Sequence, residues 1–357
     1  MLPYFILLIV PGIAYFCFRH SPKHEQADRR TLTVFFVLLY LLLALRHNTV
    51  GNDYETYRYY FETIGDMDWG GVFSVNIELG YALLNKIVSV FTDNFQWFIA
   101  VSSAIIILPV WYVYRKYLED APMTILLFIN TDLFVMFFSG IRQSISVSLG
   151  CLAFIFVKEK KWVKYLLTVA VAILFHQSAF ILLLLYPVCH YHLRKKSLYY
   201  LLPAYLVFII FNRQIFSAFL SISGMYSNYR MSQTGAYTSI ILFAIFSVYS
   251  IVIPDENKLD KTGKMLRNIM LLSLALVMFA PVHMLAMRLN YYFIIFMPLL
   301  IPKIVKYHDE KQEKLTQISK VVILVFFTCY FFYFGYSCMQ SGAGLHSFPY
   351  HFFWEAV

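Results

Sequence analysis

The chain has few charged residues for its length. Only 14% of its 357 residues are Asp, Glu, Lys or Arg, whereas 60% are hydrophobic. Soluble domains contain about 25% charged and about 45–50% apolar residues. This composition excludes an ordinary water-soluble globular domain and predicts a protein whose helices lie in a membrane.

Cysteine and the common catalytic motifs are scarce or missing. The five cysteines are odd in number and form no CxxC pair, so neither a disulfide framework nor a zinc site is predicted. The motifs GxxxxGK[ST], HExxH and GxSxG do not occur, which leaves nucleotide hydrolysis, zinc proteolysis and serine hydrolysis without support. The cluster Cys189-His190-Tyr191-His192 lacks a second group of ligands. We therefore predict no metal and no cofactor.

Apolar segments alternate with short polar loops along the whole chain. They predict an all-α polytopic membrane protein with about twelve crossings, in a range of roughly 10–14. We expect one transmembrane domain over residues 1–357, with outer loops at 46–78 and 212–238 and an outer tail at 337–357. Most Lys and Arg residues lie in every second loop along the chain. The positive-inside rule therefore explains most of the net charge of +9 and places both termini outside.

The stretch from Ser139 to Val188 contains two titratable residues in apolar surroundings. Arg142 opens an apolar segment, a lysine-rich turn follows it, and the next apolar run contains His176. Such groups are costly at membrane depth and often mark functional sites. The apolar limbs on both sides of His176 are short, which predicts a re-entrant or broken hairpin around this residue.

Nearly all cations on the predicted outer side are arginines. This bias favours planar, bidentate recognition of carboxylate or phosphate oxygens, with Arg46, Arg142 and Arg288 as the candidates. Arg142 and Arg288 are the stronger candidates, because each opens an apolar helix with no acid beside it in the sequence. The alternatives are ion pairs with the acids of residues 46–78 and, for Arg46, a snorkelling arginine at a helix end.

Five segments resemble a known family when they are read in order. They are Arg46-His-Asn-Thr-Val-Gly-Asn-Asp-Tyr-Glu-Thr-Tyr, Ile77-Glu-Leu-Gly-Tyr, Ile141-Arg-Gln-Ser-Ile-Ser, Phe175-His-Gln-Ser-Ala-Phe and Arg288-Leu-Asn-Tyr-Tyr. Together they resemble the EpsG-type, Wzy-like polysaccharide polymerases. The resemblance implies a GT-C-like glycosyltransferase of the bacterial cytoplasmic (inner) membrane. Such an enzyme polymerises undecaprenyl-diphosphate-linked oligosaccharide repeats on the outer face, for an O-antigen, capsule or exopolysaccharide.

This chemistry gives the candidate residues roles. A departing diphosphate requires preorganised cations, for which Arg142, Arg288 and Arg46 are suited. A base must accept the proton of the acceptor hydroxyl, and the candidates are His176, Glu78 and Asp53. His176 could instead stabilise the turn, and Asp53, in Gly-Asn-Asp, could instead fix a loop. Tyr54 and Tyr57 are expected to contact sugar.

The resemblance leaves other functions open. We expect membrane lipid and the lipid-linked oligosaccharide as ligands, a chain-length regulator and a flippase of the same pathway as partners, and no nucleic acid. A lipid-linked oligosaccharide flippase would favour inverted repeats and paired broken helices, and only one broken hairpin is predicted. An O-antigen-ligase-like transferase would use the same donor. A membrane acyltransferase that takes its acyl donor from the cytoplasm would require His176 on the inner side. The distribution of Lys and Arg does not place His176 there.

Overall fold

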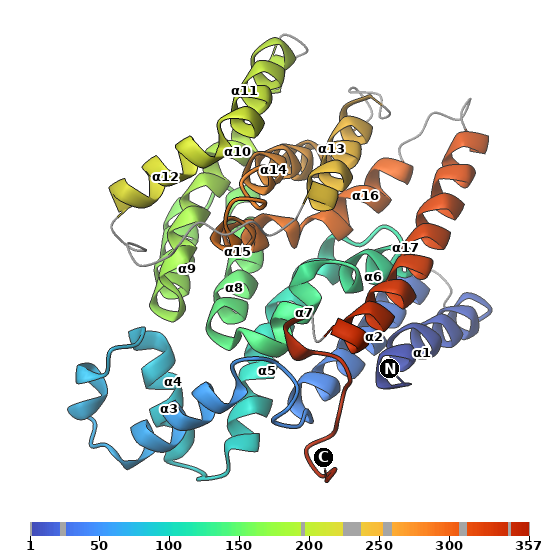
Figure 1. The fold of residues 1–357 in the computed structure, drawn as a ribbon. Helices are drawn as coiled ribbons and strands as arrows, with labels where there is room; N and C mark the ends of the chain where they lie inside the picture. Colours follow the sequence, from blue (N-terminus) through green and yellow to red (C-terminus); the bar gives the residue numbers. More distant parts are fainter. Residues whose placement is uncertain are drawn as a thin grey trace. The chain divides into compact units, whose positions relative to one another are not determined.

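The structure is a computed structural model that describes residues 2–21, 26–193, 197–223, 237–252, 259–306, 313–341 and 344–356. This part of the chain is helical and has no β-strand (Figure 1). Its one isolated β-bridge pairs Arg46 with Phe352. The α-helices are α1 (Leu2–Arg19), α2 (Ala27–Ala44), α3 (Tyr54–Asp66), α4 (Leu79–Ser89), α5 (Phe95–Tyr117), α6 (Ala121–Ile129), α7 (Asp132–Ser139), α8 (Ile141–Lys158), α9 (Trp162–Phe175), α10 (Leu185–His190), α11 (Leu198–Ile210), α12 (Asn212–Ser223), α13 (Tyr237–Val252), α14 (Lys261–Val277), α15 (Met284–Ile294), α16 (Met297–Lys306) and α17 (Glu313–Ser341). The 3₁₀ helices are η2 (Gly71–Ser74), η3 (Gln177–Leu184) and η6 (Gly344–His346).

The chain divides into two compact units, and the expected single transmembrane domain over residues 1–357 stays a prediction. The first unit contains residues 1–180 and 313–357, and the second contains residues 181–312. Both are built from helices only, among the residues that the structure describes. Each unit is therefore described by itself.

Several helices have the length and composition of membrane spans. Among the described residues, α1, α5, α8 and α17 are long and apolar enough to cross a membrane, and the number rises to seven if each bent pair is one span. The bent pairs are α6 with α7, α11 with α12, and α15 with α16. The chain is thus a membrane protein whose described segments are all-helical. The expected count of about twelve crossings is not confirmed, because some expected spans are broken and others, such as α9 and α13, are short.

Two expected outer loops contain helices. Residues 46–78 include α3 and η2, and residues 212–223 form α12, which follows α11 with a bend of 81°. In α3 the apolar and aromatic side chains of Tyr54, Tyr57, Phe61 and Ile64 recur at helical spacing and are buried. Residues 224–236 of the second loop lie outside the described residues.

Helix α8 packs between α5 and α9 in the first unit (Figure 1). Its small polar residues are buried and bond to the backbones of both neighbours. Ser146 Oγ donates to the Ala172 carbonyl of α9 at 2.6 Å, and Ser148 Oγ donates to the Ile106 carbonyl of α5. A serine hydroxyl satisfied in this way lets two helices approach closely in an apolar environment.

Helix α9 ends at His176, as the short apolar limbs predicted. The residue is the C-cap of α9 and has an extended backbone (φ −158°, ψ 121°), after which the chain continues as the 3₁₀ helix η3. The helix interruption at His176 is therefore confirmed. It places the imidazole at the end of a helix, where side chains of other segments can reach it.

The C-terminal tail is bound to the segment that follows α2. His47 N donates to the His351 carbonyl and Phe353 N donates to the Leu45 carbonyl, both at 2.9 Å. Gly51 N donates to the His346 carbonyl at 3.1 Å. Gly51 has φ of +98°, and a Cβ there would lie 2.1 Å from the Phe138 carbonyl oxygen, so this position requires glycine.

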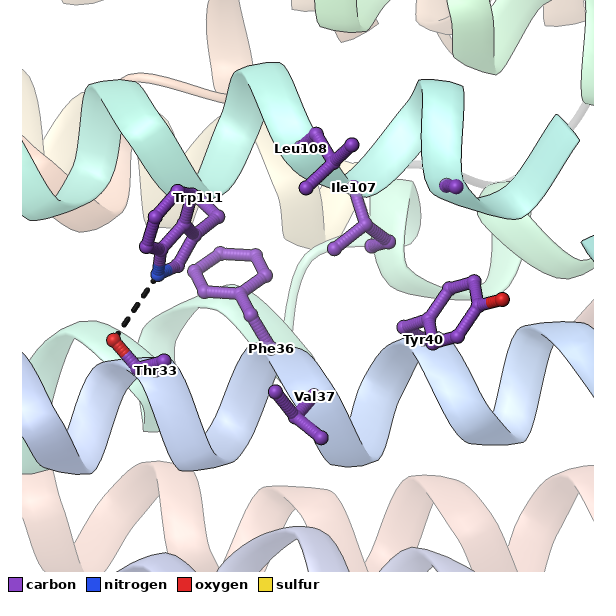
Figure 2. A pocket seen from close by; sticks show the side chains of 8 residues that line it. Thr33, Phe36, Val37, Tyr40, Ile107, Leu108 and Trp111 are labelled. Carbon is purple, nitrogen blue, oxygen red and sulfur yellow. Dashed lines mark hydrogen bonds between the residues drawn. The ribbon is translucent and has the colours of Figure 1, made fainter. Parts of the chain in front are cut away.

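An apolar cavity of about 250 Å³ lies between α2 and α5 (Figure 2). Phe36, Val37 and Tyr40 of α2 line one wall, and Ile107 and Leu108 of α5 line the other. The Trp111 indole closes one end by donating to Thr33 Oγ1 at 3.1 Å, as the dashed line in Figure 2 shows. Its lining contains no Asp, Glu, His, Lys, Arg or Cys side chain, so we do not regard it as a catalytic site.

Candidate active site

Glu78 connects the two residues that the sequence singled out in the stretch from Ser139 to Val188. Its Oε2 accepts a hydrogen bond from Arg142 Nη1, and its Oε1 lies 3.0 Å from His176 Nδ1. The three side chains are 11%, 30% and 19% exposed for Glu78, Arg142 and His176, so the cluster is shielded but reachable. No acid lies beside Arg142 in the sequence, and its partner Glu78 lies 64 residues away. The ion pair with an acid of residues 46–78, which the sequence left as the alternative, is therefore present for Arg142.

The ends of three helices bring this cluster together. Glu78 is the N-cap residue of α4, Arg142 is the second residue of α8, and His176 ends α9. Gly80 allows the first turn of α4 to lie against the last turn of α9. A Cβ on Gly80 would lie only 2.8 Å from the Leu174 carbonyl oxygen, a distance that real Cβ atoms essentially never show.

The electrostatics of the cluster keep Glu78 ionised. Burial by itself raises the pKa of a carboxyl group, but the hydrogen bond with His176 and the positive charge of Arg142 outweigh it and lower the pKa of Glu78 to about 2. Such a weak base is poorly suited to accept a proton at neutral pH. Glu78 is therefore better suited to orient its two partners than to act as the base.

Arg142 has further partners on α3 and α4. Its guanidinium hydrogen-bonds with the Tyr57 hydroxyl and lies over the Tyr81 ring, 5.9 Å from the ring centroid. Burial raises the pKa of Tyr57 to about 12, so the hydroxyl stays neutral. Arg142 Nε is buried without a hydrogen-bond partner. The guanidinium is thus held in place by a carboxylate and a phenol and keeps an unused donor.

The pairing of His176 with Glu78 has the form of a base and its orienting carboxylate. When Nδ1–H donates to Glu78 Oε1, the other ring nitrogen, Nε2, carries the lone pair and can accept a proton. The same carboxylate stabilises the imidazolium that would form. The cluster therefore combines a proton acceptor with a fixed cation, as acid–base chemistry beside an anionic leaving group requires.

Asp53 and the two predicted sugar-binding tyrosines lie at the start of α3. Asp53 is the N-cap residue of α3, although its side chain makes no capping hydrogen bond, and its charge acts on Tyr57. Tyr54 is 8% exposed and donates to Gln96 Oε1 at 3.3 Å, and Tyr57 is 3% exposed. Their rings are therefore not open stacking surfaces. The roles of Asp53, Tyr54 and Tyr57 stay predictions.

Arg46 is buried rather than snorkelling to the surface. Its side chain is 1% exposed, and Nη1 donates to the Leu43 carbonyl at 2.6 Å. Burial lowers the pKa of Arg46 to about 10, with tyrosines close by that partly offset this effect. Because the C-terminal tail pairs with this segment at Phe352, the position argues for a structural role and against direct contact with a diphosphate.

Arg288 lies in the second unit, on α15. The sequence indicated that it opens a helix, but α15 begins at Met284 with His283 as its N-cap, so Arg288 lies inside the second turn. Its side chain is partly exposed. Its role as a diphosphate ligand stays a prediction.

Sequence reasoning missed three residues that build the site. Tyr81 and Gly80 follow Glu78 in Ile77-Glu-Leu-Gly-Tyr, a segment that contributed to the family resemblance but in which only the acid was given a role. Gln96 was not singled out, yet its Nε2 donates to the Ala44 carbonyl at 2.6 Å and its Oε1 accepts from Tyr54. Tyr81 could have been found from its spacing, because it follows Glu78 by about one helical turn.

The described residues contain no group of three or more His, Cys, Asp or Glu side chains that could hold a metal ion. Comparison with curated proteins and with solved structures gave no match. The sequence profile of the EpsG family, in contrast, matches residues 29–352 and so covers most of the chain, including Glu78, Arg142 and His176. The family indicates a polysaccharide polymerase-type role for a membrane-embedded protein of this kind, and the chain belongs to the EpsG family.

Proposed function

We propose that the protein polymerises oligosaccharide repeat units linked to undecaprenyl diphosphate, by glycosyl transfer on the outer face of the bacterial inner membrane. The observation that supports this proposal most is the Glu78 carboxylate bridging Arg142 and His176. It joins a positioned base to a positioned cation. A transfer with a diphosphate leaving group needs both.

In the proposed step a hydroxyl of the acceptor saccharide attacks the anomeric carbon of the donor sugar. Its proton passes to His176 Nε2 while the new C–O bond forms. The bond between the anomeric carbon and the diphosphate oxygen breaks, and the lipid diphosphate leaves with the electron pair. Arg142 stabilises the negative charge on the leaving group, and Glu78 holds both residues and stabilises the imidazolium.

The placement on the outer face is supported by the two ends of α8 and α9. The Lys158–Lys164 turn joins them at one end, whereas Arg142 and His176 lie at the other. Helix α8 has 18 residues and is therefore about 27 Å long, close to the apolar thickness of a bilayer. With the lysines inside, as the positive-inside rule requires, the cluster lies at the outer surface. Twelve crossings, a GT-C-like architecture and outer termini belong to the same proposal.

The direct test is to incubate purified full-length protein in nanodiscs with its lipid-linked repeat unit. We expect a ladder of products that differ by one repeat, and no ladder with a His176→Gln variant. Transfer to a second acceptor without a ladder would indicate a ligase instead. Movement of the substrate between leaflets without covalent change would indicate a flippase, and either result would overturn the proposal.

A further inference from the structure

A second, polar pocket lies in the first unit and is not part of the Glu78 cluster. It has a volume of about 370 Å³, which falls in the range of small-ligand sites (roughly 300–1,000 Å³). It is formed by the segment after α2, the start of α3, the start of α5 and the C-terminal tail. The lining residues are His47, Asn48, Tyr54, Arg58, Glu62, Asp93, Asn94, Phe95, Gln96 and Phe353.

The charges of this pocket do not suit a diphosphate. Its arginine, Arg58, already pairs with Glu62 at 2.8 Å. Asp93 adds a further carboxylate, so the fixed charges of Asp, Glu and Arg side chains do not sum to a positive value. An anionic ligand would therefore be repelled rather than bound. The pocket requires a ligand that is neutral overall and rich in hydrogen-bonding groups.

The other lining residues fit a saccharide. Asn48 and Asn94 supply amide groups, and Asp93 and Glu62 supply carboxylates, which together can donate to and accept from sugar hydroxyls. The amide of Gln96 is already bonded to the Ala44 carbonyl and to Tyr54, so this side chain only shapes the wall. Phe353 is 45% exposed and offers an aromatic face. The negative face of an aromatic ring attracts the C–H groups on the apolar side of a pyranose.

The pocket is fixed in place by backbone hydrogen bonds. Phe353 N donates to the Leu45 carbonyl at 2.9 Å, so the tail holds the Phe353 ring at the pocket wall. Helix α3 connects the pocket to the cluster: Tyr54 lines the pocket, and Tyr57, less than one turn later, hydrogen-bonds with Arg142. One turn of helix is about 5.4 Å. A saccharide in this pocket would thus lie within about one helical turn of Tyr57, the residue of α3 that contacts Arg142.

We propose that this pocket binds sugar residues of the acceptor saccharide, next to those that react at the cluster. The proposal rests on the proposed function, since it assumes an acceptor that is a saccharide. It assigns Phe353 as the stacking surface and Asp93 as a hydroxyl partner. It also gives the C-terminal tail a role in binding substrate.

The test uses full-length protein in nanodiscs and lipid-free oligosaccharide fragments of the surface polysaccharide made by the bacterium that carries the gene. Binding is measured by saturation-transfer NMR. Phe353→Ala and Asp93→Asn should each weaken binding by about five- to tenfold, as loss of one good contact does. The control is Phe73→Ala, because Phe73 is 66% exposed on η2 and does not line the pocket. It should bind as the wild type does, and pyrophosphate should not compete.

Three results would overturn the proposal: no binding to the wild type, unchanged binding in both pocket variants, or displacement by pyrophosphate. Glu78→Gln separates this proposal from the proposed function, because Glu78 does not line the pocket. If Glu78→Gln extends chains normally while Phe353→Ala loses binding, the pocket stands and the catalytic assignment falls. If Glu78→Gln is inactive while both pocket variants bind normally, the catalytic assignment stands and the pocket falls.

Discussion

Replacing Glu78 with glutamine removes the charge that connects Arg142 and His176 while keeping the size of the side chain. The pKa of Glu78 falls from 4.5 to about 2 in the folded protein, a difference that corresponds to about 3 kcal/mol of stabilisation at neutral pH, as an upper bound. Because the folded-state value is the lower one, this stabilisation is present above about pH 4.5 and is lost as the pH falls toward about 2.

The effect on activity should be larger than the effect on stability. Without the carboxylate, His176 loses the partner that fixes its ring and stabilises its charged form, and Arg142 loses its counter-charge. Loss of an orienting carboxylate beside a catalytic histidine costs about 10⁴-fold in kcat in a well-studied protease, so we expect a decrease of about 10²–10⁴-fold here. Chain extension by equal amounts of folded protein, with thermal unfolding measured in parallel, separates the two effects.

Glu159→Gln is the matched control. Glu159 also bridges two cations, Lys116 at 3.2 Å and Lys161 at 2.7 Å, but it lies at the opposite end of α8 and is more exposed than Glu78. Exposed ion pairs contribute little to stability. Glu159→Gln should therefore extend chains as the wild type does. If the Glu78→Gln variant extended chains as fast as the Glu159→Gln variant, the assignment of the Glu78 cluster to catalysis would be refuted.

Three further predictions follow from the same geometry. Gly80→Ala should lower both stability and chain extension, because its Cβ meets the Leu174 carbonyl. Gly12→Ala, whose Cβ has nothing within 4 Å, should lower neither; unfolding and activity assays compare the two variants. Arg142→Lys should reduce chain extension, since lysine keeps the charge but cannot reach both Glu78 and Tyr57 as a planar fork does, and wild-type rates would contradict this. A reporter fused after Lys161 should be cytoplasmic and one at the C-terminus should not, and a cytoplasmic C-terminus would contradict the proposed orientation.

Local sequence signals predicted the type of secondary structure better than they predicted the number of membrane crossings. The apolar composition correctly indicated helices in a membrane, and the short apolar limbs around His176 correctly placed a helix break there. The apolar segment 121–139 bends by 62° between α6 and α7, at Asn130 and Thr131. Hydropathy averages over such a break, because the residues on both sides are equally apolar.

The members of the site were predictable one by one, but their pairing was not. Glu78, Arg142 and His176 were each singled out by residue type and surroundings. The Glu78 carboxylate can bond to both partners because α4 packs closely on α9. The small size of Gly80 permits this packing. The burial of Arg46 was hidden for the same reason, since it depends on a tail that lies about 300 residues away in the chain and pairs with it at Phe352.

The most direct measurement is the rate of chain extension by a stably folded His176→Gln variant. Glutamine can still donate a hydrogen bond to Glu78 and keep the end of α9 in place, but it cannot accept a proton near neutral pH. We expect the rate to fall by about 10²–10⁴-fold while the thermal unfolding midpoint stays close to that of the wild type. A product ladder of wild-type length and rate from this variant would remove His176 from catalysis.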